Sequence, residues 1–321
     1  MKILVTGGAG FIGSNLCDAL LKRNYEVRCM DNLITGKMEN ISHALSNPRF
    51  TFFQSDIRNI EACKEAMIGC EVVAHLAALG SVPRSINDPL TTNSINIDGF
   101  LNVIHTAKEL GIKRFIFAAS SSTYGDSTSL PKVEDIIGNP LSPYAVGKYV
   151  NELYAHVYAL NYGLPFIGLR YFNVFGMRQD PHGAYAAVIP KFIQQFLNGE
   201  GPTINGDGTN TRDFTHIENV IDATLLSIEN TNINADNQIY NVAYGSSTSL
   251  NQLVTLIMEA IAIRNQDIIL KNVNYGPFRK GDIPHSLASI EKIKTQLGYN
   301  PKVSIKEGIQ KTVDWILTSN R

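Results

Sequence analysis

The 321-residue sequence has few cysteines and no long apolar run. Its four cysteines, Cys17, Cys29, Cys63 and Cys70, form no Cys-x-x-Cys pair, and three of them fall in apolar segments. This spacing argues against a disulfide scaffold and a zinc site, and it indicates a reducing compartment. No apolar segment approaches the roughly 18 residues that a membrane-spanning helix needs.

The chain also lacks an excess of charge of either sign. Its 28 basic and 29 acidic residues give a net charge of −1, so no overall field attracts nucleic acid or an anionic membrane. The first residues, MKILVTGGAG, lack the charged region and the long apolar stretch of a signal peptide. We therefore expect a cytoplasmic protein with no nucleic-acid partner, no membrane partner and no metal site.

The first half of the chain alternates short β-rich segments with helical ones. The predicted strands are residues 2–6, 26–30, 50–55, 71–76, 114–120 and 165–171, and the predicted helices lie near 11–23, 59–68, 86–110 and 143–162. Such alternation indicates a parallel sheet with helices on both faces, and several strands are apolar throughout, as buried parallel strands are. We expect an α/β fold with a Rossmann-type doubly wound sheet in residues 1–175, which binds the cofactor.

After about residue 176 this pattern loosens. Helices are predicted near 184–199, 216–230, 249–263, 287–297 and 304–319, with a short strand at 238–242 and polar, glycine-rich connections between them. We expect a smaller mixed α/β lobe over residues 176–321, which binds the substrate, with some chain crossing back to the first domain.

A glycine loop follows the first predicted strand. In ILVTGGAGFIG, Gly7, Gly10 and Gly13 are spaced three residues apart, and Phe11 and Ile12 open the next helix. Glycines allow a tight turn and a close approach of the backbone to a pyrophosphate, whose charge the helix N-terminus stabilises. The loop therefore predicts a dinucleotide site.

An acidic residue at the end of the second strand supports this site. Asp31, which Asn32 follows, lies 18 residues after Gly13, near the spacing of a carboxylate that binds ribose hydroxyls. Since a carboxylate would repel a 2′-phosphate, NAD is favoured over NADP. The alternative for Asp31 is an ordinary turn residue.

Two further strand ends add candidate cofactor residues. Asp56 and Ile57, in QSDIR, follow the third strand, where an acidic side chain can meet the adenine amine. Ala77 and Ala78, in HLAAL, follow the fourth strand, and their small side chains leave room for the cofactor.

The segment SPYAVGK places Tyr144 and Lys148 one helical turn apart, after Ser142 and Pro143, which suit the start of a helix. Both side chains can therefore point into one cleft. A free tyrosine has a pKa of about 10, and a nearby ammonium together with the positive nicotinamide would favour its phenolate. Lys148 can also bind the hydroxyls of the nicotinamide ribose.

These motifs carry a resemblance to a known family. The glycine loop, SDIR, HLAA, the serine-rich end of the fifth strand, YAVGK and LRYFNVFG occur in the order found in extended short-chain dehydrogenases, over nearly the whole chain. Among them the sequence most resembles nucleotide-sugar 4-epimerases, in particular those acting on UDP-N-acetylglucosamine. Counted from Tyr124–Gly125, the resemblance implies a catalytic hydroxyl at Ser120, with Ser122 as the second candidate.

The same segment distinguishes two reaction types. Sugar-nucleotide 4,6-dehydratases resemble this chain elsewhere but carry an Asp-Glu pair where this sequence has Ser121 and Ser122. Since no acid is present there to protonate a leaving hydroxyl, we expect oxidation and reduction at C4 of the sugar.

The resemblance also implies a set of substrate-binding residues. Asn173 matches a position that binds the nucleotide diphosphate, and Asp282 one that binds the uridine ribose. Arg212 and Arg279 suit a diphosphate because guanidinium groups are permanently charged and bind oxygens in pairs. Asn205 is a further candidate.

Two departures from the glucose-type pattern concern the sugar. Epimerases that reject acetamido sugars carry a tyrosine where this chain has Ser286, and the small serine leaves space beside C2. The loop LGSVPRSIND has Gly80 where a lysine is usual, and the resemblance brings Ser81 and Arg84 of this loop near the sugar. We predict interconversion of UDP-GlcNAc and UDP-GalNAc, with UDP-glucose and UDP-galactose as further candidate substrates.

Two alternatives stay open. One keeps the fold and changes the sugar to UDP-N-acetylglucosaminuronate, which differs only around C6. The other is a non-catalytic NAD-sensing protein, a class that usually lacks the tyrosine–lysine pair. Relatives pair through helices that match residues 86–110 and 143–162, so we also expect a homodimer.

Overall fold

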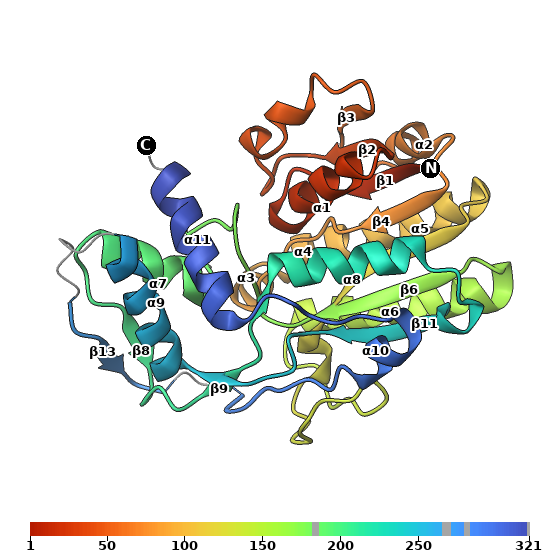
Figure 1. Ribbon diagram of the computed structural model, residues 1–321. Helices are drawn as coiled ribbons and strands as arrows, with labels where there is room; N and C mark the ends of the chain where they lie inside the picture. The colour runs from red at the N-terminus through yellow and green to blue at the C-terminus, as the bar shows by residue number, and fades with distance from the viewer. Residues whose placement is uncertain (182–185, 265–270, 279–282, 320–321) are drawn as a thin grey trace.

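A seven-stranded parallel sheet forms the centre of the protein (Figure 1). The computed structural model describes residues 1–181, 186–264, 271–278 and 283–319. The strand order is β11-β6-β5-β4-β1-β2-β3, and the order reverses between β1 and β4, which opens a crevice at the carboxyl ends of these strands. The strands are β1 (Lys2–Thr6), β2 (Glu26–Asp31), β3 (Phe50–Gln54), β4 (Val72–His75), β5 (Arg114–Ser120), β6 (Phe166–Tyr171) and β11 (Gln238–Val242). The predicted Rossmann-type fold is confirmed.

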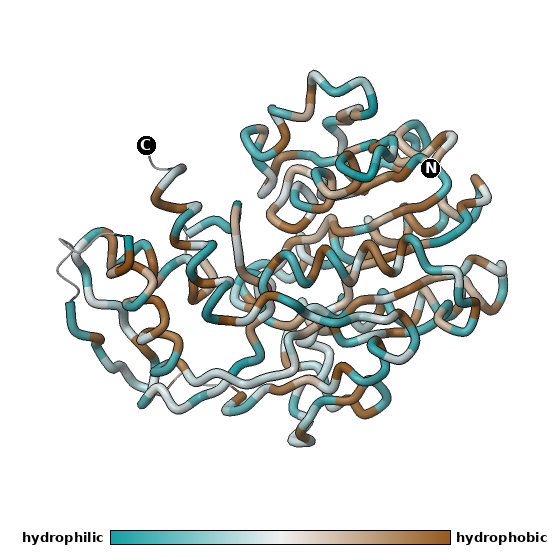
Figure 2. The backbone as a smooth tube through the Cα atoms, in the orientation of Figure 1, coloured by the Kyte–Doolittle hydropathy of each residue, from teal (hydrophilic) through white to brown (hydrophobic). Residues whose placement is uncertain are grey.

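Helices cover both faces of the sheet. One apolar core packs α1 (Phe11–Lys22), α8 (Ile217–Glu229) and α10 (Glu291–Leu297) against one face, and a second packs α2 (Ile60–Met67), α5 (Gly99–Glu109) and α6 (Pro143–Tyr162) against the other. Strand β1 serves both cores, because Ile3 and Val5 enter the first and Leu4 the second. Figure 2 shows apolar residues concentrated along the strands and alternating with polar residues along the helices.

The remaining elements form a smaller body beside the sheet (Figure 1). Its apolar core joins α7 (Val188–Leu197), α9 (Leu250–Arg264) and α11 (Ile305–Ser319). Short strand pairs complete it: β8 (Thr203–Asn205) with β13 (Asn274–Gly276), β9 (Thr211–Arg212) with β12 (Thr248–Ser249), and β7 (Val174–Phe175) with β10 (Thr215–His216). Single-turn helical segments occur at Met38–Asn40, Ser42–Ala44, Ser121–Tyr124 and Ile233–Ala235.

The helical segment predicted near residues 86–110 is confirmed, but it begins at Pro89 and a separate short helix precedes it. The chain forms α3 (Val82–Asn87), α4 (Pro89–Asn93), a π-helical turn (Ser94–Asp98) and then α5. Pro89 cannot donate the hydrogen bond that would continue α3, and the Asp88 side chain accepts the Thr91 N–H at 3.1 Å, which starts a new helix. Helix α10 also begins later than predicted, at Glu291.

The four cysteines are buried and unpaired. Within the described residues, no group of three or more His, Cys, Asp or Glu side chains is arranged to hold a metal ion. No helix in the same part of the chain is both long enough and apolar enough to cross a membrane.

A buried ion pair fastens α6 to the sheet. Arg170 on β6 donates to both carboxylate oxygens of Glu152 on α6, at 2.9 and 2.7 Å, and its third nitrogen donates to the Glu134 carbonyl at 2.9 Å. The side chains of Arg170 and Glu152 are only 4% and 3% exposed. Removing one partner of such a pair is strongly destabilising, because the other charge is then left buried without a counter-ion.

We expect Glu152→Ala to lower the free energy of unfolding by about 3–5 kcal/mol, because it leaves the Arg170 guanidinium without its counter-ion. Urea unfolding followed by circular dichroism measures this change. The control is Glu218→Ala, which breaks an exposed pair with Lys311 and should cost at most about 1 kcal/mol. Equal losses in the two variants would contradict the assignment.

Candidate active site

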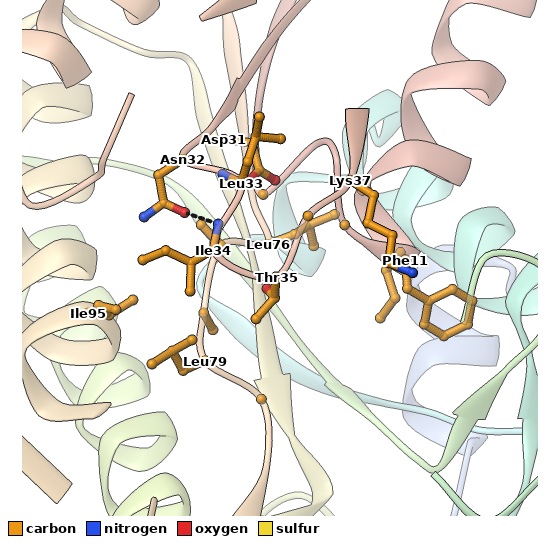
Figure 3. Close-up of a pocket in the computed structure, with 18 of the residues that line it drawn as sticks. Phe11, Asp31, Asn32, Leu33, Ile34, Thr35, Lys37, Leu76, Leu79 and Ile95 are labelled. Carbon is orange, nitrogen blue, oxygen red and sulfur yellow. Dashed lines mark hydrogen bonds between the residues drawn. The ribbon is translucent and has the colours of Figure 1, made fainter. Parts of the chain in front are cut away.

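A cavity of about 800 Å³ lies at the carboxyl end of the sheet, beside the reversal of strand order (Figure 3). Its walls come from the segments that follow β1, β2, β3 and β4, and from the chain after β7. In Figure 3, Phe11 and Lys37 lie at one side of the cavity, and Leu79 and Ile95 at the other. Open α/β sheets bind their ligands at this position.

The glycine loop forms the floor of this cavity. Gly7 has a φ of +69°, and a side chain there would lie 2.7 Å from the backbone nitrogen of Ala77. A side chain on Gly13 would lie 2.1 Å from the Gly7 carbonyl oxygen. Helix α1 starts at Phe11 without a side-chain cap, so its first N–H groups remain available to an anion. The loop and the helix end therefore fit the pyrophosphate of a dinucleotide.

Asp31 borders the cavity at the end of β2. Its carboxylate accepts the Ala9 N–H at 3.0 Å and the Leu33 N–H at 2.8 Å. Burial raises the pKa of this carboxyl, and the backbone hydrogen bonds oppose the rise. These bonds hold the carboxylate in one orientation, as recognition of ribose hydroxyls requires.

The loop after β2 contributes more of the wall than the sequence suggested. Residues 32–37 all line the cavity, but only Asn32 was predicted to. Its side-chain oxygen accepts the Ile34 N–H at 3.1 Å, which shapes the loop (Figure 3). Lys37 forms an ion pair of 3.3 Å with Asp180, which also lines the cavity. The sequence could have predicted these lining residues from their position, since the loop directly follows Asp31 at the end of β2.

The other predicted cofactor residues divide into two groups. Most of them line the cavity: Gly10, Phe11, Ile12, Ile57, Ala77 and Ala78, in addition to Gly7, Gly13, Asp31 and Asn32. Asp56 is not among the lining residues. Arg58, at 2.7 Å, and Asn32, at 2.8 Å, donate to its carboxylate, and these bonds hold its pKa down at about 2. Asp56 thus orients Asn32, and its contact with adenine stays a prediction.

Tyr144 and Lys148 lie on the first turns of α6. This helix begins as expected, because the Ser142 hydroxyl accepts the Ala145 N–H at 3.2 Å and Pro143 occupies the first turn. The buried Lys148 ammonium donates to the carbonyl of Ala118 at 2.7 Å and lies 5.9 Å from the centre of the Tyr144 ring. Ala118 lines the cavity, whereas Lys148 and the other predicted catalytic residues, Tyr144, Ser120 and Ser122, are not among the lining residues.

Burial governs the protonation of this pair. It lowers the pKa of Lys148 to about 8 and raises the pKa of Tyr144, while a hydrogen bond with Ser120 lowers the tyrosine pKa in part. The expected shift toward the phenolate depends on the ammonium together with the positive nicotinamide, and it stays a prediction.

The serines at the end of β5 form a small network. The Ser120 hydroxyl oxygen accepts the Ser122 N–H at 3.2 Å and the Ser122 hydroxyl at 2.9 Å. A hydroxyl that accepts two bonds keeps its own hydrogen for donation. Ser120 therefore faces Tyr144 as a donor, and Ser122 supports it.

Three predicted substrate residues meet around one short strand. Asn173 donates its side-chain amide to the Asp213 carbonyl at 3.0 Å, and the Ser286 N–H donates to the Thr211 carbonyl at 3.1 Å. Arg212 lies between these two positions, and its guanidinium donates to the Thr211 carbonyl at 2.8 Å.

The other predicted substrate residues are spread more widely. Ser81 caps α3 by accepting the Arg84 N–H at 3.2 Å, and Arg84 lines the cofactor cavity. Asn205 ends β8 and is exposed. Arg279 and Asp282 lie outside the described residues.

Comparison with known proteins places this site in a family. Residues 3–243 match the NAD dependent epimerase/dehydratase family. A putative UDP-glucose 4-epimerase of Methanocaldococcus jannaschii is 39% identical over 321 residues, which cover 99% of each chain.

Solved structures agree over the whole length. UDP-N-acetylglucosamine 4-epimerase from Methanobrevibacter ruminantium, in complex with UDP-N-acetylmuramic acid, is 39% identical with a TM-score of 0.92, over 99% of this chain and 98% of that one. UDP-glucuronic acid 4-epimerase from Bacillus cereus, in complex with UDP-glucuronic acid and NAD, is 34% identical with a TM-score of 0.90, over 99% and 100%. The chain therefore belongs to the NAD-dependent epimerase/dehydratase family of the short-chain dehydrogenase/reductase superfamily, and its cofactor is NAD.

Proposed function

We propose that this protein is a UDP-sugar 4-epimerase that interconverts UDP-GlcNAc and UDP-GalNAc. The proposal rests above all on Lys148, whose ammonium bonds a carbonyl of the NAD cavity one helical turn from Tyr144. A phenol, an ammonium and the Ser120 hydroxyl beside a nicotinamide form the set that carbinol oxidation needs. A non-catalytic NAD sensor would have no use for this set.

In the proposed mechanism, Tyr144 takes the proton of the C4 hydroxyl while Ser120 donates a hydrogen bond to the same oxygen. Bound NAD supplies the redox chemistry by exchanging a hydride with C4. The 4-keto sugar then turns about its diphosphate linkage and presents its other face. The hydride would return to C4 on that face, and Tyr144 would return the proton to the oxygen on C4. Lys148 holds the ribose hydroxyls and stabilises the phenolate, an effect that is strong in a buried site.

The choice of an N-acetylated sugar rests on the space near Ser286 and Gly80. Ser286 is hydrogen-bonded to the strand of Arg212, and its short side chain leaves room that a tyrosine would fill. A side chain at Gly80 would meet no atom within 4 Å, so the loop is open where glucose-type enzymes carry a lysine. The similarity to the Methanobrevibacter enzyme supports the same sugar.

A second candidate substrate is a UDP-linked uronate, including UDP-N-acetylglucosaminuronate. The observation that favours it is the similarity to the glucuronate epimerase of Bacillus cereus over the whole chain. UDP-GlcNAc and UDP-N-acetylglucosaminuronate differ only at C6 of the sugar, whereas UDP-glucuronate also lacks the acetamido group at C2.

The substrate is tested with UDP-GlcNAc, UDP-GalNAc, UDP-glucose, UDP-galactose and the N-acetylated uronate, with products separated by anion-exchange chromatography. We expect the highest kcat/KM on the neutral N-acetylated pair. Ser286→Tyr should lower kcat/KM for UDP-GlcNAc by about tenfold or more and spare UDP-glucose, because the ring fills the space beside C2. Turnover of the uronate alone would overturn the proposed substrate.

Tyr144→Phe should lower kcat by a factor of about 10²–10⁴, because it removes the group that moves the proton. NAD should stay bound, as measured by the nucleotide released on denaturation. Tyr149→Phe, on the same helix, is the matched control and should keep normal turnover. An active Tyr144→Phe variant would refute the role of this tyrosine as the base.

We also propose a homodimer formed through α3, α4 and α6. Helices α3 and α4 pack against α6, and together they expose Ile86, Leu90, Leu153, Val157 and Leu160, of which Leu90 and Leu160 are 82% and 84% exposed. Apolar side chains gathered on neighbouring helices mark a protein interface.

Light scattering of the wild type should give twice the chain mass of 35.3 kDa, and Val157→Glu should give the single-chain mass, because a buried unpaired charge opposes association. The control is Ile233→Glu, at a position that is 81% exposed and lies outside these helices. A monomeric wild type would rule the dimer out.

A further inference from the structure

Asp213 is a fully buried carboxylate that has no part in the chemistry described above. It directly follows β9 and is 0% exposed. One carboxylate oxygen accepts the Tyr244 N–H at 3.2 Å, and the other accepts the Gly245 N–H at 3.2 Å and the Ala288 N–H at 3.3 Å. Burial raises its pKa to about 7, and the backbone N–H groups act in the opposite direction.

These hydrogen bonds join segments that are far apart in the sequence. Tyr244 and Gly245 follow β11, the outer strand of the main sheet, whereas Ala288 lies two residues after Ser286. Asn173, which lies just after β6, donates its side-chain N–H to the backbone carbonyl of Asp213 at 3.0 Å. In Figure 1, β9 lies where the chain passes between the sheet and the body that contains α9.

We propose that Asp213 is a positioning residue for the nucleotide diphosphate, which sets the relative positions of Asn173, Arg212 and Ser286. This inference rests on the proposed function. Arg212 precedes Asp213 directly, Asn173 bonds its carbonyl, and Ser286 belongs to the segment that its carboxylate holds. Bonds from N–H groups to an ionised carboxylate are stronger than neutral ones, so one buried charge can keep three segments together.

A partly buried carboxylate, Asp236, offers a comparison. Asp236 is 10% exposed and pairs with Arg114 at the first residue of β5, which is the end of the strand remote from the cavity. Asp236 can stabilise the fold without touching the substrate segments. It therefore separates an effect on substrate binding from a general loss of stability.

The test is Asp213→Asn in the NAD-loaded protein, with UDP as the probe. The Asn side chain keeps the shape of the Asp side chain, but its NH2 group cannot accept a hydrogen bond from a backbone N–H. We expect the Kd for UDP and the KM for the UDP-sugar to rise about tenfold or more, the loss expected for a bond to a charged group. NAD retention should not change, kcat should stay within about threefold, and Asp236→Asn should bind UDP normally.

A milder pair of variants supports the test if Asp213→Asn does not fold. Ala288→Pro deletes one of the backbone N–H donors to the Asp213 carboxylate, whereas Ala288→Gly keeps it. We expect the proline variant alone to weaken UDP binding severalfold.

Normal UDP affinity in Asp213→Asn would overturn the role of Asp213. If Asp213→Asn does not fold, normal UDP affinity in Ala288→Pro would overturn it instead. Weakened binding in Asp236→Asn to the same degree would also overturn it. UDP binding does not require turnover. A wild type that binds UDP without epimerising any sugar would contradict the proposed function, but the effect of the Asp213 variants on UDP affinity could still be measured. A wild type that does not bind UDP overturns both.

Discussion

The hydrogen bond between the Lys148 ammonium and the Ala118 carbonyl is the contact on which the catalytic arrangement depends. It ties the first turns of α6, which carry Tyr144, to Ala118 near the end of β5, and Ala118 lines the cavity proposed to hold NAD. Burial lowers the pKa of Lys148 to about 8, which leaves the ammonium charged at neutral pH but close to titration. The same burial raises the pKa of Tyr144. The proposed phenolate is therefore favoured by the ammonium together with the positive charge of bound nicotinamide.

The proposed substrate-binding residues are organised around a single strand. Residues 211–213 contact β12, the segment around Ser286, the end of β6 and the end of β11 through backbone bonds and the Asp213 carboxylate. Segments of the main sheet and of the smaller body thereby meet at residues 211–213. This arrangement suits an enzyme whose keto intermediate must turn while its diphosphate stays bound, because the anchor can remain rigid while the sugar moves.

Much of the sheet was predictable because parallel buried strands and their helices have strong periodic signals. The glycine loop, Asp31 and the Ala77–Ala78 turn were found because each follows a strand at the same edge. The helix expected near 86–110 begins at Pro89, because Asp88 and Pro89 end the short helix before it and start the next one. The spacing of Tyr144 and Lys148 shows that a lysine is near the phenol but not how much water both groups lose.

The sequence by itself determined the fold class, the family and the identity of the residues able to carry the chemistry, because these depend on local periodicity and on motifs. Only the tertiary structure decided which residues share a wall. It brought Lys37 to Asp180, turned Asp56 toward Arg58 and made Asp213 a junction between three segments. Such contacts join residues up to 143 positions apart, and their geometry follows from how the strands and helices pack, which no local pattern contains.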